Sequence, residues 1–145
     1  LTLSDPFMVA TFKERFVQLV DNGVDVLFCN EDEANTFTGS SDNTQAIQRR
    51  GRRTPLVCIT RGANGVLIGQ DGHSVSVPAV PVEAVDTNGA GDLFAGGFLY
   101  GITHALNVEQ AGKIGSYAAA QVVAQYGPRL QRPLDSVETI LAQFE

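Results

Sequence analysis

The segment that decides the fold is Asp86-Thr87-Asn88-Gly89-Ala90-Gly91-Asp92. It follows an apolar run at residues 82–85 and precedes a helical pattern that begins at Leu93. Glycine and alanine leave the backbone N–H groups of residues 89–91 uncovered, and the N-terminus of a helix carries a partial positive charge. The segment is therefore predicted to bind an anion such as a phosphate group.

An acidic side chain, Asp92, falls in the first helical turn beside this anion site. It could complement the helix dipole while the glycines make a tight turn. It could instead accept the proton of a hydroxyl that attacks a phosphoryl group, while the N–H groups stabilise the phosphoryl oxygens. Spacing alone leaves both interpretations open.

Outward from this segment, strand and helix patterns alternate. Apolar runs at residues 24–29, 56–60 and 66–68 predict buried strands, and alternation over 73–77 after a turn at 70–72 predicts a hairpin with one wet face. Helices are predicted at residues 6–22, 31–37, 42–50, 93–100 (closed by Gly101), 108–126 (closed by Gly127-Pro128) and 136–144. The pattern indicates an α/β fold with a mostly parallel sheet and an edge hairpin.

Three polar features directly follow predicted strands. They are Asn30, Thr60 with the glycines after it, and the segment 86–92. Ligands in open α/β sheets bind at the carboxyl ends of the strands. We therefore expect these three features to converge on one edge of the sheet.

Composition narrows the possible functions. The chain has 145 residues, enough for one domain, and a net charge of −6. Its one basic cluster, Arg49, Arg50, Arg52 and Arg53, is short and has no interleaved aromatic residues. We expect this cluster to solvate a helix end, and we expect no nucleic-acid binding.

The remaining composition indicates a cytoplasmic protein without a membrane segment or a zinc site. Cys29 and Cys58 lie within apolar runs and are expected to be reduced, and His73 and His104 are isolated and expected at the surface. The N-terminal residues have no leader pattern, and 18 consecutive apolar residues occur nowhere.

The segment 86–92 resembles the second signature of the ribokinase or PfkB family, Asp-Thr-x-Gly-Ala-Gly-Asp, at every fixed position. Two further segments match the family in order and spacing. Residues 30–33 resemble its Asn-x-x-Glu element, and residues 60–65 resemble its Thr-x-Gly-x-x-Gly turn. Alone, Asn30 could simply cap a helix, and residues 60–65 could be an ordinary hairpin turn.

This resemblance implies a ribokinase-like three-layer α/β/α sandwich and a kinase that uses ATP and magnesium. It implies that Asp92 is the general base and that the neighbouring turn forms an anion hole. Asp86, with main chain near Gly127, would hold a monovalent cation such as potassium. The other implied site residues are Gly89, Ala90 and Gly91 in the anion hole; Asn30 and Glu33 around magnesium through water; and Thr60, Gly62, Gly65, Asn88 and Val123 at the nucleotide. For Val123, as for Val80 and Val82, a core role is the alternative to an adenine wall.

Residues 93–98 and 28–31 look most similar to adenosine-kinase-like members, so a nucleoside acceptor is expected. A ribokinase- or fructokinase-type sugar kinase is an alternative, as is a non-catalytic nucleotide-binding or assembly module. The module would need no base, so the retained Asp92 counts against it. A dinucleotide-binding oxidoreductase would need Gly-x-Gly-x-x-Gly after an early strand, which does not occur.

The resemblance places residues 1–145 in the C-terminal, nucleotide-binding and catalytic half of such a kinase. The N-terminal half and its lid, with most acceptor contacts, would then be absent from this chain. Parallel strands without their neighbours would expose an apolar edge. We therefore expect the chain to associate with the missing half or with a copy of itself.

Overall fold

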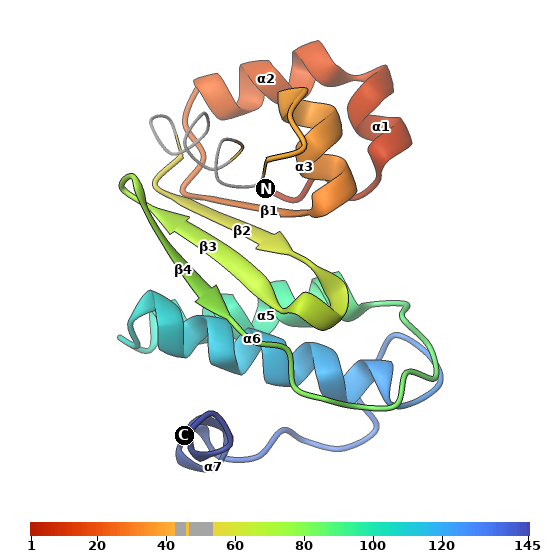
Figure 1. Cartoon of the computed structure of the whole chain (residues 1–145), viewed down its shortest axis with the longest axis vertical. Coiled ribbons are helices and arrows are strands. Elements are labelled where there is room, and N and C mark those ends of the chain that lie inside the picture. Colours follow the sequence, from red (N-terminus) through yellow and green to blue (C-terminus); the bar gives the residue numbers. More distant parts are fainter. Residues whose placement is uncertain (43–45, 47–53) are drawn as a thin grey trace. The chain divides into compact units, whose positions relative to one another are not determined.

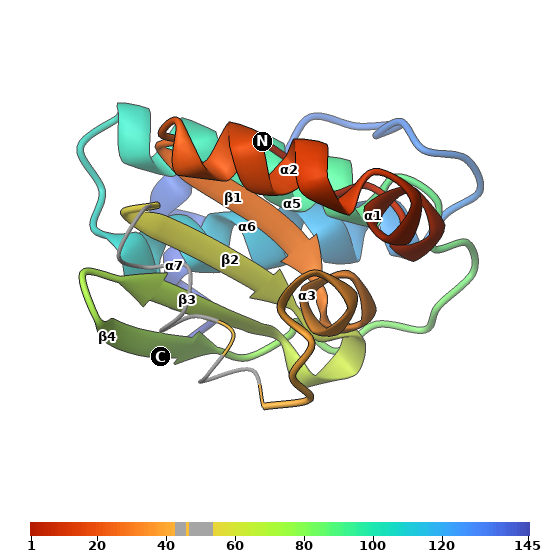
Figure 2. The ribbon, with the colours of Figure 1, turned by 90° about the horizontal axis from the view of Figure 1, so that it is seen from above.

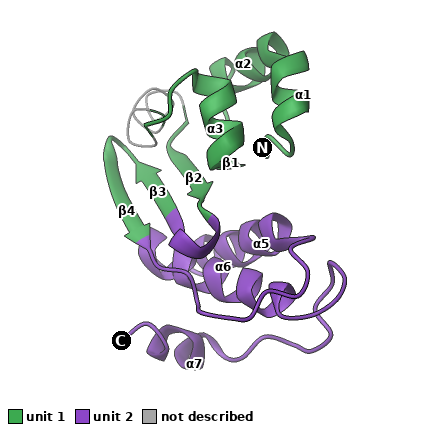
Figure 3. Cartoon of the chain, turned by 45° about the vertical axis from the view of Figure 1, so that its right-hand side comes forward, with its two compact units in different colours: residues 1–61, 67–76 green, residues 62–66, 77–145 purple. Residues whose placement is uncertain are grey.

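The computed structural model describes residues 1–42, 46 and 54–145 (Figure 1). The chain divides into two compact units (Figure 3). Unit 1 comprises residues 1–61 and 67–76, and unit 2 comprises residues 62–66 and 77–145. The predicted helix at 42–50 and the arginine cluster at 49–53 lie largely outside the described residues.

The sheet has the strand order β1-β2-β3-β4, with bounds Val26–Asn30, Leu56–Thr60, Val66–Gln70 and His73–Val77. β1 and β2 are parallel, and β3 runs against its neighbours in the predicted edge hairpin (Figure 2). Asp71 and Gly72 in its turn both have positive φ, 49° and 83°, the combination that a tight two-residue hairpin loop requires. The α/β class and the hairpin are confirmed.

The outer edge of β1 is partly covered by the chain's own first residues. Leu3 N–H donates to Phe28 O at 3.0 Å and Phe28 N–H donates to Leu1 O at 2.9 Å, which makes a parallel bridge between Thr2 and Phe28. This pairing covers β1 only over a short stretch, and the expected association through an exposed sheet edge stays a prediction. Three residues are too short to show a strand period, so this pairing could not be predicted from the local pattern.

Helices α1 (Pro6–Thr11), α2 (Lys13–Asp21) and α3 (Glu31–Thr38) belong to unit 1. The prediction of one helix over 6–22 is wrong, because Phe12 leaves helical geometry at φ −116° and ψ 28°. The apolar period is the same on both sides of Phe12, so no local signal marks the break. These helices and alternate residues of β1 and β2 form one core, whose fully or nearly fully buried members include Leu3, Val9, Val20, Leu27, Phe37, Val57 and Ile59.

Unit 2 contains α5 (Ala90–Thr103), α6 (Val108–Val123) and α7 (Val137–Ala142), with the short 3₁₀ turn η1 (Gly62–Asn64). Gly101 lies inside α5 rather than ending it. A Cβ there would lie 2.7 Å from Ala111 Cα, so the glycine allows α6 to pack closely against α5. Residues 82–85 form no strand. Val85 N–H donates instead to Val123 O, the last residue of α6, at 2.9 Å.

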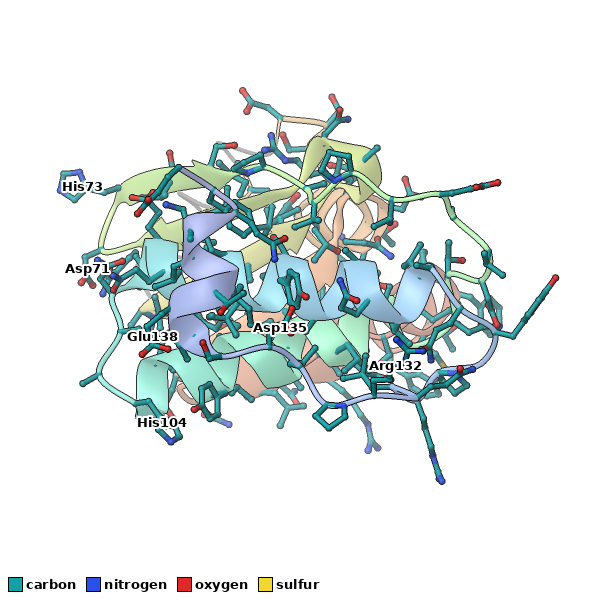
Figure 4. All side chains as sticks on the ribbon, turned by 90° about the horizontal axis from the view of Figure 1, so that it is seen from below. Asp71, His73, His104, Arg132, Asp135 and Glu138 are labelled. Atoms are coloured by element: carbon teal, nitrogen blue, oxygen red, sulfur yellow. The ribbon has the colours of Figure 1, made fainter. Side chains whose placement is uncertain are left out.

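α5 and α6 cross at glycine contacts. A Cβ at Gly97 would lie 2.9 Å from the Cα of Gly115, and a Cβ at Gly115 would lie 2.8 Å from Phe94 O. This spacing brings the two backbones into direct contact, so the crossing fixes how α5 lies on α6. Tyr117 OH of α6 donates to Asp135 Oδ2 at 2.5 Å and holds the chain just before α7, where Figure 4 labels Asp135.

The predicted roles of the cysteines and histidines are confirmed. Cys29 and Cys58 are buried free thiols, and burial raises the pKa of Cys29 to about 12. His73 and His104 are exposed at the hairpin and at the end of α5 (Figure 4). Within the described part of the chain, each helix is too short or too polar to cross a membrane.

Candidate active site

The glycine-rich segment opens α5 as predicted. Gly89 is the N-cap, with φ +81°, a left-handed geometry that glycine adopts without strain. Asp92 is exposed in the first turn, where backbone N–H groups have no partner within the helix. Ala90 N–H makes a 3.3 Å bond to Thr87 O, so it is partly used within the turn. The turn therefore offers N–H donors beside a solvent-accessible carboxylate.

Asp86 uses both carboxylate oxygens to organise the same turn. Its Oδ1 accepts the Asn88 N–H and its Oδ2 accepts the Gly127 N–H, each at 3.0 Å. These donors, Asn88 first and Gly127 second, lower the pKa of Asp86. Each oxygen can accept further bonds, so the carboxylate could also serve as an oxygen ligand of a monovalent cation.

The turn after β2 has the geometry that its glycines suggested. Gly62 begins η1 with φ +53°, and Gly65 follows it with φ +81°. A Cβ at Gly65 would collide with Val77 O and lie 2.8 Å from Ala79 N, so only glycine fits this close backbone approach. Before the turn, Thr60 ends β2, and its hydroxyl donates to Cys29 O at 3.4 Å.

Asn30 and Glu33 form a reciprocal capping box at the start of α3. Asn30 Oδ1 accepts Glu33 N–H at 2.9 Å, and Glu33 Oε2 accepts Asn30 N–H at 3.1 Å. Asn30 Nδ2 also donates to Glu33 Oε1 at 2.8 Å. The helix-cap interpretation of Asn30 is thus confirmed, and the cap fixes the orientation of a buried glutamate at the carboxyl end of β1.

Burial raises the pKa of Glu33. The Asn30 N–H opposes this shift, and the negative charges of Asp5 and Asp32 add to it. A nearby cation would stabilise the charged form of such a carboxylate. Among the described residues, His, Cys, Asp and Glu nowhere gather in a group of three that could ligate a metal directly. A magnesium ion held through water near Glu33 stays a prediction.

Glu33 should make the stability of the protein fall as pH rises. The folded protein keeps the Glu33 proton to a higher pH than the unfolded chain does. Its contribution to the free energy of unfolding is therefore largest below the ordinary glutamate pKa and declines as pH rises through the raised value. Urea unfolding of Glu33→Gln between about pH 4 and 7 should show a flatter dependence than the parent protein. Glu31→Gln, which removes a charge from the same turn, is the control, and equal slopes in all three proteins would contradict this expectation.

The structure brings the predicted residues together in two groups. In unit 1, Asn30 and Thr60 are paired in register at the ends of β1 and β2, with Glu33 beside Asn30. In unit 2, Asp86 and the turn 87–92 lie at the end of α6, where the Val123 carbonyl accepts two backbone N–H bonds. The convergence of both groups on one edge stays a prediction. From the sequence, Gly127-Pro128 was interpreted only as a helix stop, so it was not predicted that Pro128 lies against Gly89 of the turn.

Comparisons with known proteins show which family the chain belongs to. The sequence model described as "pfkB family carbohydrate kinase" matches residues 1–134. A cytidine kinase from Thermococcus kodakarensis is 37% identical over 127 residues, which cover 81% of this chain and 45% of that protein.

Two solved structures superpose on almost the whole chain. A probable sugar kinase from Rhizobium etli and an adenosine kinase from Sinorhizobium meliloti have TM-scores of 0.88 and 0.86, and each is 38% identical to this chain. The match covers 98% of this chain and 43% of each of theirs. The chain therefore spans less than half the length of the proteins that it resembles.

Proposed function

Because the chain belongs to the pfkB family of carbohydrate kinases, we propose that the intact protein transfers the γ-phosphoryl group of ATP to a hydroxyl of a nucleoside or sugar. The observation that carries the proposal is the turn 86–92, which opens α5 with uncovered N–H groups and an exposed carboxylate in one helical turn. Binding an anion needs only the N–H groups. The carboxylate beside them is explained by proton transfer.

In this proposal, Asp92 accepts the proton of the acceptor hydroxyl as its oxygen attacks the γ-phosphorus. The bond between that phosphorus and the β–γ bridging oxygen breaks, and ADP leaves. The N–H groups of Gly89, Ala90 and Gly91 stabilise the negative charge on the transferring oxygens. Of these, Gly89 and Gly91 are the stronger candidates, because Ala90 N–H also bonds within the turn.

The nucleotide would lie along the two glycine turns. Gly62 and Gly65 hold the backbone in left-handed conformations that keep side chains away from the phosphates, and Thr60 supplies a hydroxyl. Asn88 belongs to the turn 86–92, and Val123 ends the helix α6 that supports this turn. Val80 is assigned a core role, because it packs against Ile114, Tyr117 and Ile140.

Two cations fit the oxygen donors at the site. Asn30 and Glu33 would hold magnesium through its water shell, and Asp86 with main chain near Gly127 would hold potassium or a similar ion. Magnesium, when bound, neutralises charge on the β- and γ-phosphates. Burial first, and then the charges of Asp5 and Asp32, raise the pKa of Glu33, and a nearby cation would oppose this shift.

Adenosine or a closely related nucleoside is the proposed acceptor. Adenosine and cytidine kinases are among the proteins that the chain resembles, together with a probable sugar kinase. Because the chain spans less than half of their length, it would act together with the remaining part of such a kinase or with a copy of itself.

A panel of acceptors tests the substrate class. The intact protein should phosphorylate adenosine with a higher kcat/KM than ribose, fructose or other hexoses, in the presence of MgATP. A preference for a sugar by more than about tenfold, which corresponds to about 1.4 kcal/mol in transition-state binding, would contradict the nucleoside assignment. It would leave the phosphotransferase proposal intact.

A further inference from the structure

The segment that leads into the signature turn is attached to the end of α6. Val123 O accepts two backbone N–H bonds, from Val85 at 2.9 Å and from Asp86 at 3.2 Å. These bonds place the start of the turn beside the last residue of the helix. The next residues of the turn are held by the chain that follows α6.

Gly127 provides the second attachment. Its N–H donates to Asp86 Oδ2 at 3.0 Å across 41 positions of sequence, and its φ is +86°. An L side chain at Gly127 would be strained in this conformation. Asp86 Oδ1 at the same time holds the Asn88 N–H, so one carboxylate joins the loop after α6 to the turn before α5.

Pro128 provides the third attachment, directly beneath the N-cap of α5. A Cβ at Gly89 would lie 2.8 Å from Pro128 Cβ and 2.9 Å from its Cα, so the Gly89 backbone rests on this residue. Proline has a fixed φ and few conformations to lose, which makes it a stiff support. Gly89 is the residue whose orientation directs the first uncovered N–H groups of α5.

We propose that Pro128 is a positioning residue for phosphoryl transfer, because its contact with Gly89 holds the N–H groups of the turn in the orientation that the transferring oxygens need. The Asp86–Gly127 hydrogen bond keeps Pro128 in place. The inference rests on the proposed function, since it takes these N–H groups as the anion hole. Pro128 itself touches neither phosphate nor acceptor in this role.

Three variants of the intact protein test it. Pro128→Gly removes the Cβ under Gly89 and frees the backbone, whereas Pro128→Ala keeps the Cβ. Pro133→Gly makes the same chemical change at another exposed proline of the segment. We expect Pro128→Gly to lower kcat about tenfold with an ATP Kd within about threefold of the parent. Removing an anion-hole donor altogether costs about 10²–10³-fold in kcat, and a donor that is only displaced should cost part of this. Pro128→Ala should recover most of kcat, and Pro133→Gly should leave it unchanged.

A second measurement is independent of turnover. Amide hydrogen exchange at Asn88 and Leu93, whose N–H groups donate to Asp86 Oδ1 and Gly89 O, should quicken in Pro128→Gly and stay at the parent rate in Pro133→Gly when followed by NMR. Equal kcat and equal exchange in Pro128→Gly and Pro133→Gly would overturn the inference. If Asp92→Asn is inactive while the two proline-to-glycine variants behave alike, only the positioning role fails. If Asp92→Asn stays active, the general-base role of Asp92 fails, and if the parent protein itself transfers no phosphoryl group from MgATP, the proposed function fails.

Discussion

Asp92→Asn in the intact protein is expected to lower kcat by on the order of 10²–10⁴-fold, the usual contribution of a positioned general base. The amide fills nearly the same volume but cannot take up the hydroxyl proton. Affinity for ATP should survive, because it arises from the backbone N–H groups of the turn and from the magnesium shell. Initial-rate kinetics and calorimetric ATP titration of the same preparation separate the two effects.

The matched control is Glu109→Gln. Glu109 is likewise an exposed acid in the first turn of a helix, α6, where it pairs with Lys113 at 2.9 Å. Glu109→Gln removes a charge that complements a helix dipole but plays no part in proton transfer, so it measures the effect of the lost charge alone. If Asp92→Asn keeps kcat within about threefold of the parent, as Glu109→Gln should, Asp92 only complements the helix dipole and the assignment of a general base is wrong.

Two adjacent glycines of α5 should respond in opposite directions to the same substitution. Gly97→Ala places a Cβ 2.9 Å from Gly115 Cα and 3.0 Å from Ile114 O, both backbone atoms of α6 that cannot rotate away. Overpacking of this kind costs about 1–3 kcal/mol. Gly96→Ala places its Cβ in open space, so it should gain about 0.5–1 kcal/mol from helix propensity.

Urea unfolding of both variants and the parent measures this difference in the free energy of unfolding, which is about 1.5–4 kcal/mol between the variants. Gly97→Ala should also lower kcat, because the crossing of α5 on α6 sets the direction of the N-terminus that carries Asp92. Equal stability of the two variants would show that the helices are not in backbone contact at Gly97.

Features that depend on neighbours in sequence could be predicted. The strands β1 and β2, the hairpin turn at Asp71 and Gly72, and the opening of α5 at the signature all follow from local apolar period and turn chemistry. The cap at Asn30 followed from residue type and spacing. The α/β class and the family could therefore be inferred before any coordinates.

Features that depend on contacts between residues distant in sequence could not be predicted. Gly101 was interpreted as a helix end, but α5 continues through it, and the glycine instead makes room for Ala111 of α6. Val85 was placed in a strand, but its N–H pairs with a carbonyl at the end of α6. Pro128 was interpreted as part of the signal that ends α6, but its contact with Gly89 arises only in the folded chain. In each case the deciding partner is 10 or more residues away and leaves no mark on the local pattern.

The most direct test of the account is acceptor-dependent formation of ADP from MgATP by the intact protein. The account predicts that ADP appears only when magnesium and a nucleoside or sugar hydroxyl are both present, and that one phosphorylated acceptor forms for each ADP. A folded protein that binds MgATP but transfers its phosphoryl group to no nucleoside or sugar in the panel would contradict it.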